Sequence, residues 1–263
     1  MAPSGGDADA DAYISAVTTA GGTLSAGEET AIQTLFTSLK SNSLYSKLQL
    51  FYPMMGSTAA STALNGNLNT NFDITWNGSL GFSANGVQGT GTNGDYGNTN
   101  FNPSTDGGGN SFTWGIYNTA GNFSGENYMF GGYDGTYLDT NRGDSSTNTR
   151  LYGYTVGSGG TLVSAPSNDG QWTATFDATS GNKKLYFNAD QAGYASGTFS
   201  AGGLGRANID VYLFALNISN SPYRGWSGSN RFFYYGEYLT TNEVETINTI
   251  IQTFQTSLGR NTY

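Results

Sequence analysis

Hydrophobic and polar positions alternate with a period of two through the middle of the chain, from about residue 70 to residue 240. The clearest alternating runs are NFDITWNG, SFTWGIYN, QWTATFDA and the long run NIDVYLFALNIS. Turns rich in Gly, Asn, Ser and Thr separate these runs, which is typical of half-buried antiparallel strands. No helical pattern lies between them, so a parallel βαβ sheet is disfavoured. The pattern predicts a mostly β protein in which two antiparallel sheets pack face to face as a jelly-roll sandwich.

Both ends of the chain carry amphipathic helical patterns instead. Ser25-x-x-Glu28 is a capping box that opens an expected helix over about 26–40. Asp9 or Asp11 is expected to cap a short turn before it. The C-terminal helix is expected to begin at a second capping box, and its apolar stripe comprises Val244, Ile247, Ile251, Phe254 and Leu258. Such a stripe docks either on its own sandwich or on another subunit, which leaves a homo-oligomer open.

These zones predict a single compact domain in two parts. Residues 1–50 form an N-terminal lead and helical segment. Residues 51–263 form the sandwich and end in the C-terminal helix.

Charge and composition then exclude several function classes. The net charge of −9 weighs against nucleic acid and anionic membrane as partners. No apolar stretch is long enough to span a bilayer, and the N-terminal residues do not resemble a secretory signal. The chain has no Cys and no His, which excludes thiolate metal sites and the serine and cysteine triads.

The stretch GTGTNG, from Gly89 to Gly94, has the G-x-G-x-x-G spacing of a dinucleotide-binding loop. That loop requires a helix whose N-terminal amides face the phosphates. The following residues, DYGNTNFNPSTDGGGN, have no helical periodicity and contain Pro103. We therefore expect a turn and no nucleotide cofactor.

Several longer segments carry a resemblance to known families. GQWTATFDATSGNKKLYFNAD (170–190) and RFFYYGEYLTTNEVETINTI (231–250) resemble the paired strands and the closing strand and helix of concanavalin A-like, laminin-G-like sandwiches. DADAYISAV, the YPMMGSTA segment and GTGTNGDYGNTNFNPS are similar to parts of tailed-bacteriophage virion proteins. The resemblance implies a structural component of a virion, a head decoration, a head fibre or a tail-associated module. It also implies an exposed position on a particle assembled in the bacterial cytoplasm, with other virion proteins as partners.

The same resemblance suggests a hydrolase, but the residues of this chain do not favour one. Concanavalin A-like folds include glucanases that carry E-x-D-x-E on one strand, and a retaining glycosidase needs two carboxyl groups about 5 Å apart. No expected strand of this chain carries two carboxylates in phase. Glu28 and Glu243 lie at helix starts, where capping accounts for them. We therefore expect no enzymatic activity.

An Asp-rich loop offers oxygen ligands for a structural calcium ion. GGYDGTYLDTNRGDSS contains Asp134, Asp139 and Asp144 among Asn and Gly residues. The spacing is not that of an EF-hand, and Asp and Asn also form turns without any metal. Calcium and simple turn formation both remain open here.

Aromatic residues in the loops make glycan binding the alternative function. Sugar rings are expected to stack on aromatic faces while polar side chains hold their hydroxyl groups. The candidate residues are Tyr133, Asp134, Tyr137, Tyr223 and Trp226. Trp226 lies between Gly and Ser in a turn-like segment, so it is a candidate exposed ring; packing at the sandwich edge is the competing interpretation. A host surface glycan would then be the partner.

Overall fold

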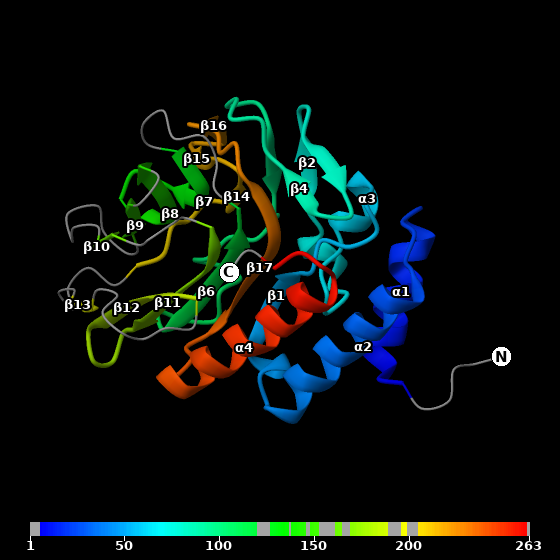
Figure 1. Cartoon of the computed structure of the whole chain (residues 1–263). Coiled ribbons are helices and arrows are strands. Elements are labelled where there is room, and N and C mark those ends of the chain that lie inside the picture. The colour runs from blue at the N-terminus through cyan, green and yellow to red at the C-terminus, as the bar shows by residue number, and fades with distance from the viewer. Residues whose placement is uncertain are drawn as a thin grey trace.

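The computed structural model describes residues 6–119, 127–136, 138–145, 148–152, 161–164, 169–188, 196–198 and 205–261. For 138–145, 148–152, 161–164 and 196–198 the description concerns the backbone. The chain forms a two-sheet β-sandwich, as the sequence predicts, with helices at both ends (Figure 1).

Sheet A has the strand order β13-β12-β11-β6-β17-β4-β3, and β1 also pairs with β17. Its strands are β1 (Leu48–Tyr52), β3 (Gly81–Ser83), β4 (Gly86–Gln88), β6 (Phe112–Asn118), β11 (Gly170–Asp177), β12 (Asn182–Phe187), β13 (Ser196–Thr198) and β17 (Ser229–Glu237). All the pairings within this sheet are antiparallel in the part of the chain that the structure describes.

Sheet B has the order β10-β9-β8-β7-β14-β5-β2, with β15 and β16 attached beside β7. Its strands are β2 (Thr75–Asn77), β5 (Tyr96–Asn98), β7 (Asn127–Tyr133), β8 (Leu138–Ser145), β9 (Asn148–Tyr152), β10 (Thr161–Ser164), β14 (Tyr212–Leu213), β15 (Leu216–Ile218) and β16 (Ser221–Tyr223).

The longest alternating run of the sequence does not form one strand. NIDVYLFALNIS divides into β14 and β15 at Phe214, whose φ of 66° lies in the left-handed region and turns the chain. As a result β14 runs antiparallel to β7, whereas β15 runs parallel to it. Sheet B is therefore mixed. The alternating pattern does not reveal this turn, because Phe214 is buried as a strand residue would be.

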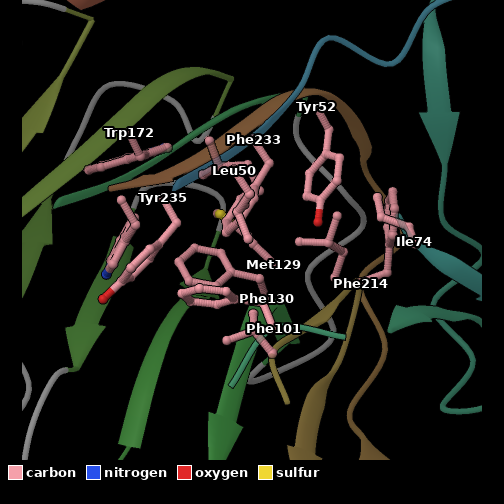
Figure 2. Packing of buried hydrophobic residues seen from close by; sticks show 14 of the residues in the cluster. Leu50, Tyr52, Ile74, Phe101, Met129, Phe130, Trp172, Phe214, Phe233 and Tyr235 are labelled. Carbon is pink, nitrogen blue, oxygen red and sulfur yellow. The ribbon is translucent and has the colours of Figure 1, made fainter. Parts of the chain in front are cut away.

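The main core lies between the two sheets and is dominated by aromatic rings (Figure 2). Phe130 of sheet B lies with its ring centroid 4.6 Å from that of Trp114 and 5.0 Å from that of Phe233, both in sheet A. Trp172 of sheet A is also fully buried. Rings of this size each bury a large apolar area, and most of the aromatic side chains in the described part of the chain are buried.

A second core joins the helices to the outer face of sheet A. The helices are α1 (Ala8–Thr19), α2 (Ala26–Ser41), α3 (Ala59–Thr62) and α4 (Thr241–Ser257), with short 3-10 turns at Tyr45–Lys47 and Thr70–Phe72. Figure 1 shows α2 and α4 side by side against one face of the sandwich. Phe51 of β1 stacks on Phe232 of β17, and Phe36 of α2 packs on Phe51. The helices thus pack on their own sandwich.

Both predicted capping boxes form, and the first helix begins earlier than expected. The Ser25 and Thr240 side chains each accept the N3 amide, and Glu28 and Glu243 each accept the N-cap amide. Asp7, and neither Asp9 nor Asp11, is the N-cap of α1, because its carboxylate accepts the amides of residues 9 and 10. Among the described helices, none combines the length and the apolar character needed to cross a bilayer.

A buried polar network fixes α4 on the sheet. Asn248 of α4 accepts hydrogen bonds through its Oδ1 from Gln171 Nε2 at 2.7 Å and from Thr173 Oγ1 at 2.9 Å. The Thr173 hydroxyl also lies 2.9 Å from the hydroxyl of Tyr234. Because Gln171, Thr173 and Asn248 are all buried, this network favours one register of the helix over sliding along an apolar face.

The predicted division of the chain falls within a strand. The boundary between residues 50 and 51 lies inside β1, whose Leu48 contributes to the helical core and whose Leu50 contributes to the core between the sheets. The N-terminal segment and the sandwich therefore share a strand.

Candidate functional site

The GTGTNG stretch is a loop, as the sequence predicts. Its organising residue is Asp95, whose carboxylate accepts hydrogen bonds from the Thr90 hydroxyl, from Thr92 Oγ1 at 2.6 Å and from the Ser79 amide at 2.7 Å. β5 follows the loop directly, so no helix begins at it. Because the Asp95 carboxylate is held by hydroxyl and amide groups of the loop and its neighbour, no ligand is needed to explain this Asp.

The same loop covers Trp226, and the prediction that Trp226 is an exposed ring is wrong. Trp226 is 1% exposed and belongs to the core between the sheets. A Cβ on Gly89 would lie 2.0 Å from the Trp226 carbonyl oxygen, so the glycine allows the loop to pack against this residue. Since its ring is buried, Trp226 offers no surface for a sugar.

Tyr223 is the predicted ring that does reach the surface. It is 38% exposed at the end of β16, the largest exposure of a large hydrophobic side chain among the described residues. The Arg224 guanidinium carbon lies 5.0 Å from the centre of the Tyr223 ring, in cation–π geometry. The Arg224 guanidinium orients the Tyr223 ring from one side and places a hydrogen-bond donor next to it.

Tyr223 stands beside a small cluster on the outer face of sheet B. Its ring centroid is 6.3 Å from that of Tyr128. Tyr128 packs with Leu216, and Tyr133 and Ile218 pack against this pair. We call Tyr128, Tyr133 and Tyr223 the tyrosine cluster. It unites two of the predicted residues, Tyr133 and Tyr223, which are 90 positions apart in the sequence.

Asp134 lies next to the tyrosine cluster and acts through its backbone partners. One carboxylate oxygen accepts the Thr136 amide and the other accepts the Asn208 amide, both at 2.8 Å. The Tyr133 hydroxyl donates to the Gly135 carbonyl at 2.9 Å in the same turn. Asp134 therefore ties the end of β7 to the segment before β14.

The remaining predicted residues of this loop are placed only in part. Tyr137 lies outside the described residues. Asp139 and Asp144 fall in β8, whose backbone pairs with β7 and β9. Within the described side chains no group of three or more metal-ligating residues gathers. The calcium site therefore stays a prediction.

A second tyrosine pair extends the same face of sheet B. Tyr212 of β14 lies opposite Gly131 of β7 and Asn98 of β5, on the side away from the core. Its ring stacks on that of Tyr96 with centroids 4.3 Å apart. Burial, followed by the neighbouring Tyr96 and Asp210, raises the pKa of Tyr212 to about 12, so its hydroxyl stays protonated at neutral pH.

Sequence reasoning missed this pair, although part of the signal was present. The in-phase residues Val211 and Leu213 place Tyr212 on the opposite face of the strand. What the sequence lacks is the register that brings β5 beside β14 and sets Tyr96 against Tyr212.

Comparisons with known proteins place the fold. No protein-family model matches the sequence, and no curated protein matches it significantly. Among solved structures, domain 4 of a GH43 arabinanase from Geobacillus stearothermophilus, in complex with arabinotriose, aligns with a TM-score of 0.52 and 18% identity. The alignment covers 77% of this chain and 98% of that domain.

Two sialidase-related structures are also similar. A Trypanosoma rangeli sialidase aligns with a TM-score of 0.55 and 11% identity over 84% of this chain, but the aligned part is 39% of the sialidase. A Ruminococcus gnavus sialidase CBM40 domain, bound to sialyllactose, aligns with a TM-score of 0.41 and 13% identity over 52% of this chain. At such identities, the likeness to the arabinanase domain and to the Trypanosoma rangeli sialidase shows a shared fold alone.

Proposed function

We propose that this protein is a non-catalytic glycan-binding β-sandwich. The observation that carries the proposal is the exposed ring of Tyr223, held by Arg224 and backed by the tyrosine cluster on a rigid sheet. Exposed, rigidly held aromatic rings give a stacking surface to the apolar face of a sugar at little entropic cost. Arg224 and the backbone groups of the Asp134 turn supply hydrogen bonds to its hydroxyl groups.

The comparison with the arabinanase domain supports the proposal from a different direction. That domain is similar over nearly its whole length and was seen with arabinotriose bound. A neutral oligosaccharide is therefore the first ligand class that we propose for this chain.

The absence of cleavage is part of the proposal. Two of the glutamates, Glu28 and Glu243, are committed to helix caps. Asp134 is the carboxylate next to Tyr133 in the sequence, and its two oxygens accept backbone amides. A glycosidase needs a pair of carboxyl groups that flank the bond. We expect no release of reducing ends from any oligosaccharide that binds.

We further propose a virion as the setting in which this binding occurs. The proposal rests on the segments similar to tailed-phage virion proteins, near the N-terminus and in the loop before β6. A displayed glycan-binding module would then contribute to recognition of the host surface. Mass spectrometry of purified virions tests this setting separately from binding. Finding this chain in the virions supports the setting, and its absence contradicts it.

The binding proposal is tested by substituting the exposed ring. Tyr223→Ala removes the stacking surface, and we expect it to weaken binding of arabino-oligosaccharides about tenfold in isothermal titration. Tyr238→Ala is the control, because Tyr238 is a partly buried tyrosine just before α4, away from the cluster. Equal binding by the two variants and the unaltered protein would contradict the proposal.

A further inference from the structure

A hollow of about 400 Å³ lies on the outer face of sheet A, where β3 and β4 meet β17. Val87 and Phe82 point into the core, so the alternate residues of this hairpin face outward. The residues whose side chains carry the chemistry of the hollow are Ser83, Asn85, Gln88, Thr119, Ser229 and Arg231.

Most of the polar side chains that line the hollow are neutral hydrogen-bonding groups. The Thr119 and Ser229 hydroxyls bond to each other at 2.7 Å, and Gln88 donates to the Ser227 carbonyl. Hydroxyl and amide groups of this kind both donate and accept, as the hydroxyl groups of a sugar do. No carboxylate is among the residues that line the hollow in the described structure.

Arg231 is a desolvated cation at one wall. Its Nη1 donates to the Arg260 carbonyl, and its Nε is buried without a hydrogen-bond partner in the described structure. No ion pair forms with it in the part of the chain that the structure describes. Burial lowers the pKa of the Arg231 guanidinium, with Tyr117 and Asp169 acting in the opposite direction, but an Arg stays protonated.

A second guanidinium stands behind the first. Arg260 is 1% exposed and has no ion pair among the described residues; its nearest partners are the Met54 carbonyl at 3.5 Å and the Met55 sulfur at 3.4 Å. Burial lowers the pKa of Arg260 to about 10, and repulsion from Arg231 adds to this effect. The carboxylate of Glu28 acts on Arg260 in the opposite direction, as that of Asp169 does on Arg231, and Arg231 is the cation that lines the hollow.

We propose that this hollow is a second binding site, which holds an acidic sugar by its carboxylate. Arg231 supplies a charge-assisted hydrogen bond to the carboxylate, and the hydroxyl and amide groups of Ser83, Asn85 and Gln88 hold the sugar hydroxyls. The volume suits a ligand of one or two sugar rings. This proposal rests on the glycan-binding function, but it uses the opposite face of the sandwich from the tyrosine cluster.

The test compares a charged sugar with its neutral ester on the full chain. Digalacturonate is titrated calorimetrically beside its methyl ester, and arabinotriose reports on the tyrosine cluster. We expect the acid to bind at least about tenfold more tightly than the ester. Arg231→Gln removes this preference, whereas Tyr223→Ala leaves it intact.

A second variant guards against a folding defect, because Arg231 also bonds to the Arg260 carbonyl. Ser83→Trp fills the hollow from an exposed hairpin position and leaves Arg231 in place. We expect it to abolish digalacturonate binding with an unchanged thermal midpoint. Equal affinity for acid and ester, acid binding that survives both variants, or no binding of the acid would overturn the proposal. Arabinotriose binding that persists in these cases would leave the tyrosine cluster as the site.

Discussion

Trp226 and Tyr223 lie three residues apart and have opposite environments, one buried and one exposed. The glycines around Trp226 look like a flexible, open turn in the sequence. In the structure, a Cβ on Gly225 would lie 2.3 Å from the Thr92 carbonyl oxygen, and one on Gly228 would lie 2.3 Å from the Trp226 indole nitrogen. These glycines mark close packing around a buried ring.

At the same scale, Asp95 gives a prediction about pH. Burial by itself raises the pKa of Asp95, but hydrogen bonds from Thr90, Thr92 and Ser79 outweigh it and hold the pKa below its ordinary value of 3.8. The unfolded chain therefore binds the proton more readily than the folded one. The stability contributed by this carboxylate is complete above pH 3.8 and is lost as the pH falls through the folded-state pKa.

We expect Asp95→Asn to lower the free energy of unfolding by about 1 kcal/mol at pH 7. The difference from the unaltered protein should shrink as the pH is lowered past 3.8. Urea unfolding of both proteins at a series of pH values measures this difference in the free energy of unfolding. A difference that stays constant down to pH 2 would show that the charge of Asp95 has no part in closing the loop.

Among the elements, the helices could be predicted from the sequence and the strand order could not. α2 and α4 are specified locally, because a capping box and an apolar stripe together fix their starts and their buried faces. Strand pairing depends on contacts between distant segments. β5 and β14, for example, are joined by a register that no local pattern contains.

The cap of α4 provides a test at this scale. Thr240→Ala removes the side-chain acceptor for the Glu243 amide, and we expect a loss of about 1 kcal/mol in the free energy of unfolding. Thr249→Ala is the control, since the Thr249 hydroxyl donates within the exposed face of the same helix. Because Ala is the better helix former, the control should be neutral or slightly stabilising in denaturant unfolding. Equal losses in the two variants would show that the cap adds nothing specific.

At the scale of the whole molecule, the outer faces of the two sheets differ in what covers them. The helices cover part of the outer face of sheet A. The hollow at Arg231 lies beside the C-terminal end of α4. The outer face of sheet B carries the tyrosine cluster and the Tyr96–Tyr212 stack. Of the predicted residues, Tyr133 and Tyr223 meet on one surface, while Trp226 belongs to the core. The Arg231 hollow was out of reach, since it depends on β3, β4 and β17 coming together.

The most direct test of the account is a binding screen of the purified full chain against neutral and acidic oligosaccharides, run beside Tyr223→Ala. We expect the unaltered protein to bind a defined set of glycans. We also expect Tyr223→Ala, with an unchanged thermal midpoint, to lose binding of the neutral members of that set. A folded protein that binds no glycan, or a variant that binds all of them equally well, would contradict it.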